Sequence, residues 1–168
     1  MADQIRDGDT LFINSGTTTQ CIANALRSRK SLNVVTDPLT VATKLGGISS
    51  IRVALLGGKI NTQYGFTYGS DTQEQLSRYQ ADWVILSVDC INHKNGITTH
   101  HAEEAVIDRM MISSARNVLV AVDHRKIGCV GFARVCDRTE NINLITDSAA
   151  DENVLAELEN EGWGIICA

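Results

Sequence analysis

A run of apolar residues leads directly into a turn of small and hydroxyl-bearing residues at positions 11–19. The turn contains Ser15, Gly16, Thr17 and Thr18, and a helical pattern follows it. The first N–H groups of a helix have no acceptor within the helix, and the helix dipole favours an anion there by about 0.3–1 kcal/mol. Glycine also lets a ligand approach the backbone closely. The pattern predicts a phosphate site, although an ordinary turn with Ser15 or Thr17 as the helix cap explains the same residues.

Two further polar clusters come after apolar runs, at residues 89–95 and 123–126. Asp89 supplies a carboxylate that accepts hydrogen bonds from sugar hydroxyls, and Lys126 supplies a positive charge for a phosphate. A buried carboxylate needs a partner, whereas a loop lysine is often only solvated. Because ligands bind beyond the carboxyl ends of the strands in open parallel sheets, the clusters together with residues 14–18 predict a sugar-phosphate pocket.

The pair His100 and His101 lies close to Glu103 and Glu104, which raises the question of a metal site. Adjacent histidines point in different directions on a helix or a strand, so they rarely ligate one ion together. We therefore expect no metal, and we expect these residues to form a polar loop that caps the pocket. No cofactor is expected either.

Short runs rich in β-branched residues alternate with longer helical patterns, which is typical of an α/β domain with a mostly parallel sheet covered by helices. Several runs, such as residues 84–86, are continuously apolar, as in strands that are buried on both faces. The predicted strands are residues 10–13, 32–36, 51–56, 83–88, 117–122, 144–146 and 164–167.

Helix boundaries are indicated by capping residues. Asp37 is a good N-cap because Pro38 follows it at the first helical position, and Gly46-Gly47 ends that helix. Ser70 and Gln73 have the spacing of a capping box for a helix that continues to residue 78. Two further helices are predicted at residues 102–116 and 151–161.

The composition limits the class of protein. A chain of 168 residues suits one domain, which buries about 70% of the surface of its unfolded chain. The net charge of −5 argues against a nucleic-acid-binding surface. Five cysteines without a C-x-x-C pair fit reduced thiols better than a disulfide framework. No apolar run approaches the ~20 residues of a membrane span, and no signal peptide is evident, so we expect a cytoplasmic protein without a membrane partner.

A series of short motifs occurs in order along nearly the whole chain. The motifs are Ser15-Gly16-Thr17-Thr18, Gly57-Gly58, Phe66 with Gly69, Val88-Asp89-Cys90-Ile91, Gly96-Ile97-Thr98, Asp123-x-x-Lys126 and Ile145-Thr146-Asp147. Through this ordered set the chain resembles the effector-binding, C-terminal sensor domain of DeoR-family bacterial transcriptional regulators. The resemblance implies a Rossmann-like fold of the ribose-5-phosphate isomerase and CoA-transferase type.

The resemblance also implies a function. It implies a single effector-binding domain over residues 1–168, a phosphorylated sugar or sugar-like effector, and a homo-oligomer that takes part in repression of carbohydrate metabolism. In that family a winged helix-turn-helix domain precedes the sensor and binds operator DNA. We expect this DNA-binding domain to be absent from the present chain, so that operator DNA is a partner only through it.

Residues are carried over where they match the family pattern. The phosphate loop is residues 15–18, Lys126 resembles the isomerase-type lysine that reaches the phosphate, and Asp89 matches the aspartate of a Gly-Ala-Asp-Gly-Ile pattern. The sequence departs from the pattern where Ser87 and Cys90 stand in place of glycines, and where His124 replaces a usual serine.

The largest departure is Asp108, which stands where these regulators usually have a lysine before Arg109. A carboxylate in that place inverts the local charge, which weakens any transfer of a known effector to this chain. Glu104, Asp108 and Arg109 are candidates for the mouth of the pocket. Their simpler interpretation is structural: Glu104 as a helix N-terminal acid, Asp108 as a partner of Arg109 or part of a solvated helix face, and Arg109 as a surface or interface cation.

Two alternative functions remain open. In an isomerase Asp108 would take the place of the catalytic glutamate, but it is one methylene shorter. Leu86 and Cys90 replace two acidic residues of the isomerase motif, so we expect no enzyme activity. The second alternative is an oligomerisation module without a ligand.

Overall fold

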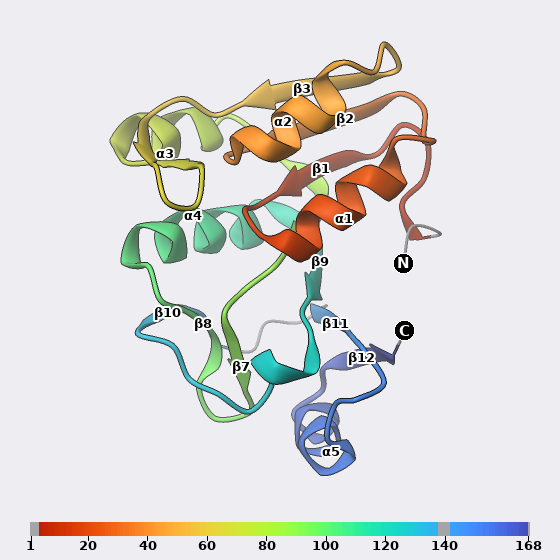
Figure 1. Cartoon of the computed structure of the whole chain (residues 1–168), viewed down its shortest axis with the longest axis vertical. Coiled ribbons are helices and arrows are strands. Elements are labelled where there is room, and N and C mark those ends of the chain that lie inside the picture. The colour runs from red at the N-terminus through yellow and green to blue at the C-terminus, as the bar shows by residue number, and fades with distance from the viewer. Residues whose placement is uncertain (1–3, 138–141, 168) are drawn as a thin grey trace.

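The computed structural model describes residues 4–137 and 142–167. A seven-stranded sheet lies at its centre (Figure 1). It consists of β1 (Thr10–Ile13), β2 (Leu32–Thr36), β3 (Ile51–Leu55), β6 (Ala81–Leu86), β9 (Ala115–Ala121), β11 (Ile142–Thr146) and β12 (Gly164–Cys167). The strand order is β12-β11-β9-β6-β1-β2-β3, and all neighbouring strands are parallel. The predicted α/β class with a mostly parallel sheet is therefore confirmed.

Helices cover both faces of this sheet. The helices α1 (Thr17–Leu26) and α2 (Leu39–Gly46) pack on one face, and α3 (Ser70–Leu76), α4 (Ala102–Ser113) and α5 (Glu152–Asn160) pack on the other. Because side chains alternate along a strand, Leu11 and Ile13 point toward α1, whereas Phe12 points to the opposite face. Strands buried on both faces explain the continuous apolar runs in the sequence.

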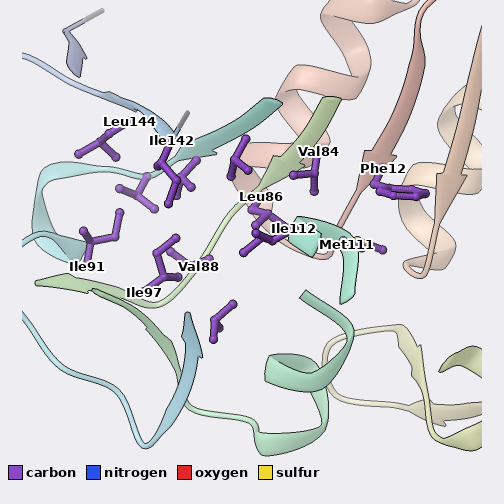
Figure 2. Close-up of a cluster of buried hydrophobic side chains, with 14 of the residues drawn as sticks. Phe12, Val84, Leu86, Val88, Ile91, Ile97, Met111, Ile112, Ile142 and Leu144 are labelled. Carbon is purple, nitrogen blue, oxygen red and sulfur yellow. The ribbon is translucent and has the colours of Figure 1, made fainter. Parts of the chain in front are cut away.

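The second face carries a larger hydrophobic cluster, part of which is shown in Figure 2. Val84 and Leu86 of β6 point into it together with Met111 of α4. Ile91 and Ile97 enter the same cluster from a small antiparallel sheet. This sheet is made of β7 (Cys90–Asn92), β8 (Gly96–Thr99) and β10 (Ala133–Cys136), in the order β10-β8-β7. In Figure 1 it lies below α4.

Two shorter elements complete the surroundings of the site. A hairpin joins β4 (Lys59–Asn61) to β5 (Phe66–Tyr68), and the 3-10 helix η2 covers His124–Lys126. The sequence pattern predicts neither the hairpin nor the β7-β8-β10 sheet. Strands of three or four residues are too short for a recognisable period, and they form here because they pack against larger elements.

Three predicted helix caps are wrong. Gly16 is the N-cap of α1 and Gly69 is the N-cap of α3, and neither start has a side-chain cap hydrogen bond. The helix α2 begins at Leu39 after Pro38, and the Asp37 side chain does not cap it. The reason is that the Leu39 N–H, which an Asp37 cap would bind, donates instead to Gly65 O of the hairpin turn over 3.0 Å. By contrast, Asp151 caps the predicted last helix through Asn153 N.

The expectation that all cysteines are reduced is also wrong. A disulfide joins Cys90 of β7 to Cys129, which follows η2, and the two Cα atoms are 5.2 Å apart. The remaining cysteines, Cys21, Cys136 and Cys167, are free. The pair is separated by 39 residues, so only the fold brings its members together.

Among the described residues, no helix is both long enough and apolar enough to pass through a membrane.

Candidate functional site

A cavity of about 320 Å³ opens at the carboxyl ends of the neighbouring strands β1 and β6. Its walls come from the β1–α1 turn, the segment after β6, the β4–β5 turn, the β8–α4 junction and the end of η2. This is the sheet edge at which the sequence predicts a ligand, and the volume is suitable for a small metabolite.

The β1–α1 turn forms one wall of the cavity. Ser15, Gly16 and Thr17 line it, whereas Thr18 lines a separate hollow. Gly16 has φ 152, and a Cβ atom there would lie 2.5 Å from Ser87 Cβ. Because no side chain caps the helix, the first N–H groups of α1 are available to an anion. The close approach to the segment after β6 explains why this position requires glycine.

Asn14 fixes the turn to the next strand. Its Nδ2 donates to Ser87 O and to Asp108 Oδ1, both over 3.0 Å, and its Oδ1 accepts from Ser87 N over 2.8 Å. Asn14 is completely buried. Two of these hydrogen bonds hold the ends of β1 and β6 in a fixed relation, and the third joins them to α4. The Ser87 hydroxyl lines the cavity and has no partner among the described residues.

Asp89 and Glu104 form the opposite wall and share one hydroxyl. Thr99 Oγ1 lies 2.8 Å from Asp89 Oδ2 and 2.8 Å from Glu104 Oε2. A hydroxyl has a single proton, so it donates to only one of these oxygens. The other short contact requires a proton on the carboxyl group. The remaining partners are His100 N, which donates to Asp89 over 2.8 Å, and Ser15 Oγ, which donates to Glu104 over 2.6 Å.

The surroundings shift the pKa values of these two carboxyl groups in opposite directions. Burial opposes ionisation of Asp89, but hydrogen bonds from His100 N and the Thr99 hydroxyl, with attraction by His100 and Lys126, outweigh it and lower its pKa. Burial is the largest influence on Glu104 and raises its pKa despite hydrogen bonds from Ser15 and Thr99. The two carboxyl groups that share the Thr99 hydroxyl therefore differ: the Asp89 carboxylate is favoured, and ionisation of Glu104 is disfavoured.

Of the three candidates for the mouth, only Glu104 lines the cavity. Asp108 is 1% exposed and lies beneath the cavity floor. Burial, followed by repulsion from Glu104 and Asp37, raises the pKa of Asp108 well above its usual value. Arg109 points away and binds the small sheet, donating to Val135 O over 2.9 Å. Asp108 is therefore a buried group supported by Asn14, and Arg109 joins α4 to β10.

Lys126 is at the end of η2 and lines the cavity. Asp123 caps this short helix by accepting from Arg125 N. The preceding His124 is held by Asp147, which accepts from His124 N over 2.8 Å. These contacts position the lysine, and they account for the Asp123-x-x-Lys126 spacing in the sequence.

Several residues of the site are not among the predicted ligand-binding residues. His100 and His101 line the cavity, as expected of a polar capping loop. Tyr64 and Gln63 line it from the β4–β5 turn, where the Tyr64 ring lies 4.6 Å from the His101 ring. No signal in the sequence links this turn to the pocket. Across residues 4–137 and 142–167, no group of three His, Cys, Asp or Glu side chains is arranged to hold a metal ion.

The fold and the site define an α/β domain with a polar cavity that is lined by a helix N-terminus, a lysine and a carboxylate. Residues 1–148 match the family model of the DeoR C terminal sensor domain. The chain belongs to this family, and the resemblance seen in the sequence is confirmed.

Two relatives of the chain are bacterial repressors. The chain is 33% identical over 161 residues to the HTH-type transcriptional repressor GlcR of Bacillus subtilis, and this alignment covers 96% of the chain and 62% of the relative. The chain is 34% identical over 128 residues to the glycerol-3-phosphate regulon repressor of Escherichia coli, and this alignment covers 76% of the chain and 51% of the relative. The chain thus spans between half and two thirds of the length of these relatives.

Solved structures show the same fold. Ribose 5-phosphate isomerase A from Neisseria gonorrhoeae aligns with a TM-score of 0.54 and 14% identity, over 74% of this chain and 48% of the isomerase. The enzyme from Methanocaldococcus jannaschii aligns with a TM-score of 0.53 and 12% identity, over 74% of this chain and 49% of the isomerase. The predicted isomerase-type fold is confirmed, and the identity is too low to carry a function over.

Proposed function

We propose that the domain senses a phosphorylated sugar or polyol for a transcriptional repressor of carbohydrate metabolism. The observation that carries this proposal is the division of one cavity into two chemically different walls. Ser15 to Thr17 and Lys126 offer hydrogen-bond donors and positive charge, and Asp89 offers a charged acceptor. An anionic phosphate fits the first wall, and the hydroxyl groups of a sugar fit the second.

The relatives support this ligand class. The name of one of them, the glycerol-3-phosphate regulon repressor, refers to a phosphorylated polyol. In such a repressor, operator DNA is bound by a separate DNA-binding domain, and the net charge of −5 suits a sensing rather than a DNA-contacting role here. We place this activity in the cytoplasm, where the repressor meets DNA.

The switch needs only a modest difference in free energy. To change operator affinity tenfold to a hundredfold, the ligand must discriminate between two states by about 1.4–2.8 kcal/mol. Two or three charge-assisted hydrogen bonds made in one state supply this difference. We propose that the states differ in the packing of subunits in a homo-oligomer. The exposed side chains of Val130 and Phe132 support self-association, which light scattering tests directly.

The same geometry favours sensing over catalysis. An isomerase requires a carboxylate that moves a proton between neighbouring carbon atoms of the bound sugar. Asp108, at the corresponding place in the sequence, is buried beneath the cavity and does not line it. The purified chain should therefore give no ribulose 5-phosphate from ribose 5-phosphate above a heat-inactivated control.

A thermal-shift screen tests the proposed ligand class. The panel contains glucose 6-phosphate, fructose 6-phosphate, ribose 5-phosphate and glycerol 3-phosphate, each beside its unphosphorylated parent. A ligand at a hundred times its Kd stabilises the native state by about 2.7 kcal/mol, which raises the Tm by several degrees. We expect such a rise with a phosphorylated compound and none with its parent. Equal rises with both, or no rise with any, would contradict the proposal.

A further inference from the structure

The disulfide between Cys90 and Cys129 joins the two segments that carry the charged residues of the cavity. Cys90 follows Asp89 directly, and Cys129 comes three residues after Lys126. The Cys129 sulfur lies 3.4 Å from Lys126 O and 3.6 Å from Asp89 O. The covalent bond is therefore placed where it fixes the backbone of both residues at once.

Backbone contacts also connect these segments, but they are few. Gly128 N donates to Ile91 O over 2.8 Å, and Ile91 forms an isolated bridge with Ile127. These contacts do not need the disulfide, so the segments stay adjacent when it is reduced. Reduction removes the covalent restraint beside Asp89 and Lys126 without unfolding the β7-β8-β10 sheet.

The other cysteines lack these features. Cys21 and Cys167 are exposed and free. Cys136 is half-buried, and burial raises the pKa of its thiol to about 12, which disfavours the reactive thiolate. Cys129 is partly exposed, whereas Cys90 is 4% exposed. The pair thus combines a partly exposed residue with a buried one.

We propose that Cys90 and Cys129 form a reversible thiol–disulfide site whose oxidation state sets the spacing of Asp89 and Lys126. The effect on a bound sugar phosphate rests on the proposed function, whereas the exchange reaction itself does not. In cellular compartments that keep thiols reduced, a disulfide is usually transient and redox-sensing, which fits a site beside a sensor cavity.

The oxidant belongs to the class of low-molecular-weight disulfides, such as oxidised glutathione. In the reduced protein the thiolate of the partly exposed Cys129 attacks one sulfur of this disulfide, forms a mixed disulfide and releases one thiolate of the small molecule. The Cys90 thiolate then attacks the Cys129 sulfur and releases the second thiolate. Overall the two protein thiols lose two electrons and two protons, and the small disulfide is reduced to two thiols.

The first test follows thiol labelling and backbone hydrogen exchange without any ligand. The protein is equilibrated with oxidised or reduced glutathione, its free thiols are alkylated, and the modified cysteines are identified by mass spectrometry. We expect Cys90 and Cys129 to be protected in the oxidised sample only. Exchange over residues 88–92 and 126–129 should rise about tenfold or more on reduction, and exchange in β1 and β2 should not change.

Serine variants separate this site from general effects of the reagent. Cys129→Ser should show the fast exchange of the reduced protein in both samples, and Cys167→Ser should behave like wild type. If both cysteines are alkylated in the oxidised sample, or if exchange over 88–92 and 126–129 is the same in both samples, the inference is overturned. Tm values of all variants show whether a substitution has simply unfolded the protein.

The second test measures binding of glucose 6-phosphate and glycerol 3-phosphate to the oxidised and the reduced protein by calorimetry. We expect at least one of them to bind with affinities that differ about fivefold or more between the two states. Equal affinity in both states would overturn the proposed control of the cavity. If neither compound binds in either state, the proposed ligand class is contradicted for these two compounds, and the labelling and exchange results still decide whether the cysteine site exists.

Discussion

The two walls of the cavity differ in the groups that they present. The β1–α1 wall presents backbone N–H groups and a glycine that admits no side chain. The opposite wall relies on side chains, with Thr99 placed between Asp89 and Glu104. Ser15 connects the walls, because its hydroxyl donates to Glu104 over 2.6 Å.

This difference teaches that the walls should respond differently to mutation. A site formed by backbone N–H groups depends on shape, and it tolerates no added atoms where Gly16 packs against Ser87. A side-chain site depends on protonation, so its affinity changes with pH and recovers with conservative replacements. Variants of each wall probe this contrast, beginning with the one expected to have the largest effect.

Gly16→Ala should have the largest effect. The added Cβ would lie 2.5 Å from Ser87 Cβ, at a φ that side chains rarely adopt, so the turn must move. We expect a loss of about 2–4 kcal/mol in the free energy of unfolding and a loss of sugar-phosphate affinity of about a hundredfold. Denaturant unfolding and calorimetric titration measure both. The control is Gly46→Ala, where the added Cβ would meet no neighbouring atom within 4 Å, and this variant should keep full affinity.

Lys126→Ala should weaken binding of phosphorylated compounds about tenfold or more, because a charge-assisted hydrogen bond is worth about 1.5–3 kcal/mol. The matched control is Lys94→Ala, an exposed lysine of the β7–β8 turn that does not line the cavity. Unphosphorylated parents should bind equally weakly to both variants. An equal loss of affinity in the two variants would mean that Lys126 acts only through the general charge of the surface.

Thr99→Val should act on the carboxyl wall alone. The valine removes the hydroxyl that Asp89 and Glu104 share, so the pKa of Asp89 should rise. As the solution is acidified, binding that needs the Asp89 carboxylate should then be lost at a higher pH than in wild type. Titration of the carboxyl ¹³C signals and binding measured on acidification from pH 7 test this. Thr99→Ser keeps the hydroxyl and should restore the wild-type profile, and a valine variant with an unchanged profile would contradict a role of the Thr99 hydroxyl in holding Asp89 ionised.

Asp108→Asn should leave binding within about twofold of wild type but should change how stability depends on pH. The folded-state pKa of Asp108 is raised well above its unfolded value, chiefly by burial. The native state therefore holds a proton that the unfolded state has lost, so this group lowers stability as pH rises from about 4 through its folded pKa. The variant should lose less stability between pH 5 and pH 8, by on the order of 1 kcal/mol.

Asp37 is a second fully buried carboxyl group whose pKa burial raises well above its usual value. Because Asp37 is unchanged in Asp108→Asn, the stability of the variant should still fall with pH, but less steeply than that of wild type. Urea unfolding at several pH values measures the effect. A slope in Asp108→Asn identical to that of wild type would show that Asp108 is ionised in the native protein, which contradicts a protonated carboxyl group beneath the cavity.

The sequence predicts the β1–α1 wall much better than the carboxyl wall. The strands at 10–13 and 32–36 are confirmed at both ends, because each is a mostly apolar run that is soon followed by Gly16 or Pro38. The wall formed by Asp89, Thr99 and Glu104 depends instead on strands of three and four residues. Their pairing places Cys90 opposite Thr98, which brings Asp89 to Thr99, and no local pattern shows this.

Contacts between distant residues account for the remaining differences. Ser15 and Glu104 are 89 positions apart, and Asn14 and Asp108 are 94 positions apart. Local patterns in a single sequence carry no information on such pairs. The family resemblance supplies the order of the motifs, but it does not indicate that Asp108 lies beneath the cavity, that Tyr64 covers its edge, or that Cys90 bonds to Cys129.

Amide NMR tests the assignment of the two walls most directly. The ¹⁵N-labelled protein is titrated with the sugar phosphate that gives the largest thermal shift and, separately, with its unphosphorylated parent. We predict that the phosphate compound shifts the amide signals of Gly16, Thr17, Thr18 and Thr19, and that the parent shifts mainly signals near Asp89 and Thr99. A second, separate cavity is lined by residues of β1, β2 and β3, among them Val34 and Arg52. If the phosphate compound instead shifts signals around Val34 and Arg52, the assignment of the site is contradicted.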